Sequence, residues 1–280
     1  MRTSKRLKLG FEGGFVGALD SLGLTDNAVY IFSPYKNLLS SYKGSAIKVQ
    51  RDDLSSEWFE YKEDGTLDKV SILNFCGSGD GKVEEVSNPY DTNYNTKQTV
   101  SSSYRPRIVI SGVFQEHGIK FDAIDDYLNV EKYSAINFTT FPFTVFVQAY
   151  TPATNNGYYF VINTDSGTNA QYSLYNLSGT INWKLNTTAV QTTYQQITDE
   201  NYISVYRSGG TSAQAITTNA SSTTGTYSAS LTEYSFMNVG ARSSAVDNST
   251  HSVFYDGYIK TIIIFNTNIY TRYSELVEAI

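Results

Sequence analysis

The chain has little of what most metal and redox sites are made from. Its 280 residues include one cysteine and two histidines, so no disulfide can form within it, and the spacing typical of Cys/His metal ligands is missing. We therefore expect Cys76 to be a small buried apolar residue, and we expect no cofactor and no metal. A chain of this length buries about 75% of the surface that its unfolded form exposes, and it needs neither a disulfide nor a metal ion to fold.

Charge is also scarce. Only 17% of the residues are charged and the net charge is -6, so the basic footprint of a nucleic-acid-binding protein is missing. The start is locally basic, at Arg2, Lys5, Arg6 and Lys8. Glycines and acidic residues break the apolar stretch that follows, so it predicts neither a signal peptide nor a membrane-spanning helix.

What the chain does have is tyrosine (23) and phenylalanine (15), together with many serine, threonine and asparagine residues, a composition typical of strands and turns. Two short helices are expected, over residues 67–75, before Gly77, and over residues 270–280. Residues 82–106 are expected to be an irregular loop. Short strands are predicted at residues 28–35, 45–52, 107–111, 119–124, 127–132, 143–150, 157–164, 170–177, 180–185, 201–208, 214–219, 236–241 and 252–265. The pattern predicts an all-β antiparallel sandwich over residues 25–280, preceded by an arm over residues 1–24.

Acidic groups are the first candidates for chemistry. Asp122, Asp125 and Asp126 resemble a calcium cluster, but their spacing is not that of an EF-hand, and a structural role in a turn between strands is favoured. The adjacent pair Glu84 and Glu85 is expected to point to opposite faces of a strand and so cannot flank one bond.

The two histidines lie far apart in the sequence, at positions 117 and 251, and no nucleophile-elbow serine accompanies either. We expect both to be solvated loop residues. The glycine-rich segment CGSGDGK lacks the ending of a phosphate-binding loop and follows a predicted helix, so a plain turn is the better interpretation.

Five segments occur in the same order as in the α-L-arabinofuranosidase B family and resemble it, together with its non-enzymatic relatives in phage virion proteins. They are SYKGSAIKVQRDD, LDKVSILNFCGSGDGK, PYDTNYNTKQT, RPRIV and GIKFDAIDDYL. The resemblance implies a concanavalin-like jelly roll, with a laminin-G-type sandwich in the second half.

The resemblance fails at the positions that would carry catalysis. The nucleophilic glutamate of the family corresponds to Gln171 or Tyr172, and its acidic aspartate corresponds to Arg242, with Asp247 several residues late. A retaining glycosidase needs two carboxyl groups about 5 Å apart. We therefore expect no enzymatic activity.

The resemblance also implies a ligand surface. Tyr172, Tyr175 and Trp183 would form an aromatic platform for a sugar, with Gln171, Arg242 and Asp91 near it. The alternative is that the three aromatic residues belong to the core, and this alternative is slightly favoured.

Three functions stay open. The first is a phage virion protein of a fibre, spike or capsid decoration, present as a homo-oligomer, made in the host cytoplasm, docked on other virion proteins by the basic arm and facing a host glycan. The second is a glycoside hydrolase whose acids are Asp247 and Asp256. The third is a free-standing lectin.

Overall fold

The computed structural model describes residues 15–131, 142–150, 156–164, 171–177, 180–185, 194–195, 200–209, 212–218, 221–226, 234–243 and 251–280. Within them, the helices are α1 (Ala18–Ser21), α2 (Lys69–Cys76) and α3 (Tyr273–Ala279), with 3₁₀ turns η1 (Thr25–Asn27), η2 (Thr92–Tyr94), η3 (Ser102–Tyr104) and η4 (Tyr270–Arg272). The strands of the first half are β1 (Ala28–Phe32), β2 (Ser45–Gln50), β3 (Ser56–Glu60), β4 (Gly81–Val86), β5 (Thr96–Lys97), β6 (Arg107–Ile110), β7 (Val113–Phe114), β8 (Ile119–Asp122) and β9 (Leu128–Glu131). Those of the second half are β10 (Phe143–Tyr150), β11 (Gly157–Thr164), β12 (Gln171–Leu177), β13 (Thr180–Leu185), β14 (Tyr194–Gln195), β15 (Glu200–Gly209), β16 (Ser212–Thr218), β17 (Ser221–Thr226), β18 (Tyr234–Val239), β19 (Arg242–Ser243), β20 (His251–Ser252) and β21 (Asp256–Phe265).

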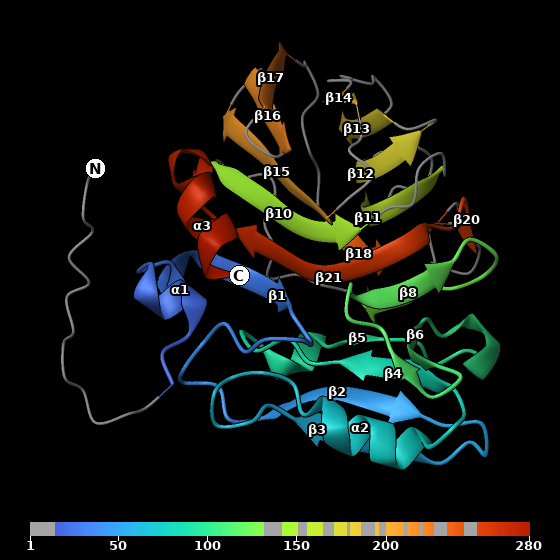
Figure 1. Cartoon of the computed structure of the whole chain (residues 1–280). Coiled ribbons are helices and arrows are strands. Elements are labelled where there is room, and N and C mark those ends of the chain that lie inside the picture. The colour runs from blue at the N-terminus through green and yellow to red at the C-terminus, as the bar shows by residue number, and fades with distance from the viewer. Residues whose placement is uncertain are drawn as a thin grey trace, which may run out of the picture.

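Two layers of antiparallel strands make up the body, and both belong to one hydrogen-bonded network that curls on itself (Figure 1). In the first layer β10 and β21 pair at the centre. The sheet continues from β10 through β15 to β17, and β21 pairs on its other side with β8 and β1. The second layer runs in the order β9, β18, β11, β12, β13. Strands β2, β3, β4 and β6 extend the network, and β5 joins β4 to β9. The predicted all-β antiparallel sandwich is confirmed.

The main core lies between the two layers. In β10, Phe143, Val145 and Val147 pack in one cluster with Phe160 of β11 and Leu174 of β12. Side chains alternate between the faces of a strand, so the residues between them point to the other side of the sheet. The prediction that β10 is a central strand is confirmed, because β15 and β21 pair with its two edges.

A second core covers the outer side of the first layer. Phe146 of β10 and Ile263 of β21 pack there against Leu19 of α1 and Leu276 of α3. The covering helices lie beside β1 and β10 in Figure 1. Residues 15–24 of the expected arm therefore pack on the body of the protein. The basic residues Arg2, Lys5, Arg6 and Lys8 lie outside the described residues.

The predicted helix after residue 66 is present as α2. Its first turn is capped by Asp68, whose carboxylate accepts a hydrogen bond from the Ser71 N–H at 3.2 Å. It ends at Gly77, whose φ of 61° suits a residue without a side chain. No helix among the described residues has the length and apolarity needed to cross a membrane.

The expectation of a loop from residue 82 onward is wrong at its start, where β4 lies. Lys48 of β2 pairs with Glu85 and Val49 pairs with Val83, so Glu84 is an extra, bulged residue. The bulge separates the buried Val83 and Val86 by three positions instead of two. This spacing hides the alternation by which a strand is recognised in a sequence.

Candidate functional site

A row of polar side chains crosses the second layer on the side that faces away from the core. Asn129 of β9 lies opposite Asn238 of β18, and Asn238 lies opposite Val161 of β11. Val161 in turn lies opposite Ser173 of β12. Directly paired residues share a face of the sheet, and the residues next to them, such as Leu174, belong to the core. We call this side of β9, β18, β11, β12 and β13 the outer face.

The polar groups of the outer face are buried. Asn238 and Ser173 are 0% exposed, Asn182 of β13 is 2% exposed and Asn129 is 7% exposed. Neither Ser173 Oγ nor Asn129 Oδ1 has a hydrogen-bond partner among the described residues. Buried polar groups are normally hydrogen-bonded, so these atoms call for a partner that the described chain does not supply.

An aromatic pair borders this row. The rings of Tyr158 and Tyr175 stack with centroids 4.9 Å apart, and Val161 completes a small apolar cluster with them. Tyr158 reaches the outer face because Tyr159 is bulged out of the pairing between β11 and β12. Burial raises the pKa of Tyr158, although the Arg242 guanidinium, which hydrogen-bonds to the Tyr158 hydroxyl, acts to lower it. Two predicted ligand residues, Tyr175 and Arg242, thus meet around Tyr158.

His251 of β20 closes one side of the outer face. Its Nε2 donates to Asn238 Oδ1 at 3.3 Å, and its ring stacks on Tyr127 with centroids 3.7 Å apart. Burial lowers the pKa of His251 to about 4, so the ring is neutral at pH 7. The expectation of a solvated loop residue is therefore wrong for His251. His117 is exposed, and it stacks on Tyr150.

The other two aromatic residues of the predicted platform belong to the core. Tyr172 is 0% exposed and Trp183 is 1% exposed, and their rings meet edge to face at 5.7 Å. Tyr172 and Tyr175 are three positions apart on β12, and an odd separation puts two residues on opposite faces of a strand. The structure therefore does not gather the three rings on one surface.

The remaining predicted residues are scattered. Gln171 begins β12, but its side chain lies outside the described part of the chain, as does Asp247. Asp91 accepts a hydrogen bond from the Asn93 N–H at 3.1 Å and caps η2. Asp256 lies on β21 in the first layer, where it pairs with Lys120.

Glu84 and Glu85 are both partly exposed in the bulged β4. Glu84 accepts hydrogen bonds from Lys48 Nζ at 2.7 Å and Ser56 Oγ at 2.8 Å. Burial acts to raise the pKa of Glu84, but these hydrogen bonds and the Arg105 charge lower it overall. A general acid needs the opposite shift.

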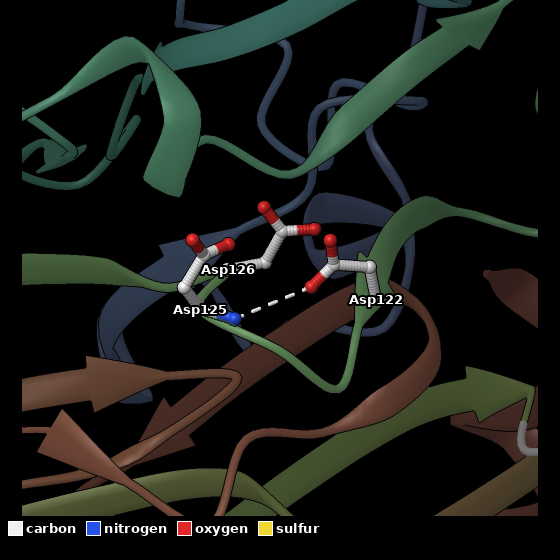
Figure 2. Close-up of side chains that lie close together, drawn as sticks. All are labelled: Asp122, Asp125 and Asp126. Atoms are coloured by element: carbon white, nitrogen blue, oxygen red, sulfur yellow. Dashed lines mark hydrogen bonds between the residues drawn. The ribbon is translucent and has the colours of Figure 1, made fainter.

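Three carboxylates meet in the turn between β8 and β9. One carboxylate oxygen from each of Asp122, Asp125 and Asp126 lies within 4.8 Å of the other two. Figure 2 shows the three side chains close together. Asp122 Oδ1 accepts hydrogen bonds from the N–H groups of Ile124 at 2.9 Å and Asp125 at 3.4 Å. Burial, followed by the charge of Asp122, raises the pKa of Asp126 to about 8, while Arg107 opposes the shift.

A separate cavity of about 490 Å³ is lined by Lys36, Lys62, Lys69 and Lys260, among others. Lys69 pairs with Glu116 at 2.8 Å and Lys62 pairs with Asp64 at 3.9 Å. Lys36 Nζ donates to the Ala279 carbonyl at 2.7 Å. Lys36, Lys62 and Lys69 are thus already held by partners.

Sequence reasoning missed Asn129, Ser173, Asn182 and Asn238. One signal could have found them, because each stands in the middle of a predicted strand, where asparagine is depleted. Asn182 and Asn238 sit between apolar neighbours, in INW and MNV. A polar residue repeated at this position in several strands indicates a polar surface on one face of the sheet.

No protein-family model matches the sequence, and no curated protein matches it. Among solved structures, the chain is similar to a GH54 α-L-arabinofuranosidase soaked with a cyclic sulfate inhibitor, with 13% identity and a TM-score of 0.73. A mutant GH54 enzyme soaked with 4-nitrophenyl α-L-arabinofuranoside gives a TM-score of 0.69, and an arabinofuranosidase complexed with arabinofuranosyl-α-1,2-xylobiose gives 0.66, both at 13% identity. Each match covers 94% of this chain and 65% of the other. The chain therefore shares the arabinofuranosidase sandwich fold and spans less than two thirds of the length of those proteins.

Proposed function

We propose that the chain is a glycan-binding sandwich that does not hydrolyse its ligand. The observation that carries this proposal is the outer face, where Asn129, Asn238 and Ser173 lie in one cross-strand row beside the stacked rings of Tyr158 and Tyr175. The fold it shares with the arabinofuranosidases supports the same function.

The chemistry of the outer face suits a sugar. An aromatic ring presents an apolar face to the C–H groups of a pyranose or furanose, while amide and hydroxyl groups bind its hydroxyls. Ser173 Oγ and Asn129 Oδ1, buried and without a described partner, are atoms that sugar hydroxyls would satisfy. The Arg242 guanidinium adds a fixed donor at the edge of the same surface.

Hydrolysis requires more than this surface offers. Its described side chains are hydroxyl, amide, aromatic, imidazole and guanidinium groups, and none is a carboxylate: Asn129, Tyr158, Val161, Ser173, Tyr175, Asn182, Asn238, Arg242 and His251. A retaining enzyme uses one carboxylate as nucleophile and a second carboxyl group as acid. Asp256, one of the two acids of the hydrolase alternative, lies in the other layer and forms an ion pair with Lys120.

The proposal is tested with two sugars that arabinofuranosidases accept in crystals. Calorimetry with arabinofuranosyl-α-1,2-xylobiose should show binding, and 4-nitrophenyl α-L-arabinofuranoside should release no nitrophenol. Tyr175→Ala and Asn238→Ala should each weaken binding about tenfold or more, as expected for the loss of a buried contact. The matched exposed variants Tyr90→Ala and Asn266→Ala should bind normally. Nitrophenol release that Asp247→Asn abolishes would support the hydrolase instead.

We further propose that the protein is a phage virion component held by its basic arm. The support is the sequence resemblance to phage virion relatives and the cluster of Arg2, Lys5, Arg6 and Lys8. Deleting residues 1–14 should abolish incorporation into particles while glycan binding persists. Unchanged incorporation would refute docking through the arm, and a protein never found in particles would be a free-standing lectin.

A further inference from the structure

The turn between β8 and β9 contains an acidic group that the proposed function does not use. Asp122 and Asp125 are partly exposed, and Asp122 is engaged with the backbone of its own turn. Two such carboxylates are ordinary in a solvated turn. The third carboxylate, that of Asp126, distinguishes this turn from an ordinary one.

Asp126 is 1% exposed, and neither of its oxygens makes a hydrogen bond with a described residue. The carboxyl group instead lies close to those of Asp122 and Asp125 (Figure 2). A carboxyl group buried in this way either stays protonated or, when ionised, costs several kcal/mol unless a charge of opposite sign compensates it. A cation bound where the three carboxyl groups meet would compensate the ionised form of Asp126.

The described residues supply little positive charge at this place. Arg107 of β6 is the nearby cation, and its Nη2 lies 4.0 Å from Asp122 Oδ2. The same guanidinium also faces Asp80, with Nε 3.7 Å from Oδ2. The neighbouring Lys120 is paired with Asp256. One guanidinium thus faces four carboxylates, those of Asp80, Asp122, Asp125 and Asp126.

We propose that Asp122, Asp125 and Asp126 bind a divalent cation, and specifically Ca²⁺. Hard oxygen ligands without histidine or cysteine favour Ca²⁺ or Mg²⁺ over zinc and copper. Mg²⁺ usually keeps several waters and takes only one or two carboxylates, whereas Ca²⁺ accepts more protein oxygens in a flexible geometry. A set of three protein carboxylates therefore fits Ca²⁺ better.

The cation would act on the neighbouring outer face through the chain. Tyr127 follows Asp126 directly, donates its backbone N–H to the Tyr104 carbonyl at 3.1 Å and stacks on His251. Asn129, two residues further on, belongs to the polar row. Fixing Asp126 thus fixes the start of β9, which bears part of the outer face.

The test is Ca²⁺ binding to the full chain, measured by calorimetry after removal of metal with a chelator and without any glycan. We expect one Ca²⁺ per chain, with a dissociation constant on the order of 10⁻⁵–10⁻³ M and weaker binding of Mg²⁺. Asp126→Asn, which keeps the shape of the side chain, should weaken binding about tenfold or more, and so should the partly exposed Asp125→Asn. Asp26→Asn, which changes an exposed aspartate in η1, should bind like the unaltered protein.

The proposal would be overturned if the unaltered protein gave no binding heat and no thermal stabilisation with about 10 mM CaCl₂. This concentration exceeds the dissociation constants of the weakest protein calcium sites. The proposal would also be overturned if Asp126→Asn and Asp125→Asn both bound Ca²⁺ with the affinity of the unaltered protein. The unaltered protein is measured directly, so poor folding of a variant cannot decide the result, and the result does not depend on whether the outer face binds a glycan.

Discussion

Side chains of the second layer divide between core and outer face according to their position along each strand. Leu174 and Trp183 lie opposite each other and point into the core, whereas Tyr175 and Asn182 lie opposite each other and point outward. A shift of one position thus decides whether an aromatic ring points into the core or toward the outer face.

Trp183 should act on stability. Replacing it with alanine should lower the free energy of unfolding by about 3–5 kcal/mol, the usual cost of removing a buried tryptophan. The matched variant Tyr175→Phe keeps its ring and should cost less than about 1.5 kcal/mol. Urea denaturation measures both. If Trp183→Ala retained full stability and lost only sugar binding, the division of residues described above would be wrong.

His251 should make stability depend on pH. Its folded-state pKa of about 4 lies below the ordinary value of 6.5, so the unfolded chain binds the proton more readily. The stability associated with the neutral ring is present above pH 6.5 and is lost as the pH falls toward 4. We expect the free energy of unfolding to fall more steeply over this range in the unaltered protein than in His251→Gln. Parallel pH profiles would contradict the buried, neutral ring.

Among the elements, the bounds of β10, β11 and β13 agree with their predicted ranges, because turn residues mark the ends of these apolar strands. The bulges within strands could not be predicted from sequence. In β4 the bulged Glu84 concealed the strand, and in β11 the bulged Tyr159 determines which tyrosine faces outward. A bulge is a property of the pairing with a neighbouring strand, which the local sequence does not reveal.

The same limit applies to the site. Tyr175 and Arg242 were predicted through the family resemblance, and the structure brings both to Tyr158. Asn238 and Ser173 were not predicted, because a single polar residue in a strand does not indicate which strands lie beside it. The cross-strand row exists only once β9, β18, β11 and β12 are in order.

The end of α2 gives a test of backbone conformation alone. Gly77 has φ of 61° and ψ of -128°, and a Cβ added to it would meet no atom within 4 Å. Gly77→Ala should therefore lower the free energy of unfolding by about 1–3 kcal/mol through backbone strain. Ser78→Ala, at the next exposed position, should leave it within about 0.5 kcal/mol. If Gly77→Ala were as stable as the unaltered protein, the end of α2 would not require the positive φ described for Gly77.

At the scale of the whole molecule, the two layers differ in how their outer sides are covered. The first layer is covered by α1 and α3, whereas the outer face of the second layer carries a row of buried polar groups and no described helix lies on it. The N-terminal segment therefore divides into residues 1–14 and residues 15–24, and residues 15–24 complete the second core.

Truncation should separate these parts. Removing residues 1–14 should leave the free energy of unfolding within about 1 kcal/mol, because every described residue of the second core is kept. Removing residues 1–24 also removes the buried Leu19 and Leu24, and should cost about 3–6 kcal/mol. Thermal and urea denaturation of the two variants measure this difference. Equal stability of both would mean that α1 contributes nothing to the second core.

The central claim is that the outer face of the second layer is where this sandwich holds a sugar without cleaving it. A crystal structure of the chain soaked with arabinofuranosyl-α-1,2-xylobiose tests it most directly. We predict an intact trisaccharide against Tyr158 and Tyr175, hydrogen-bonded to Arg242 or Asn129. A cleaved sugar, or one bound only in the lysine-lined cavity beside Lys36, would contradict the account.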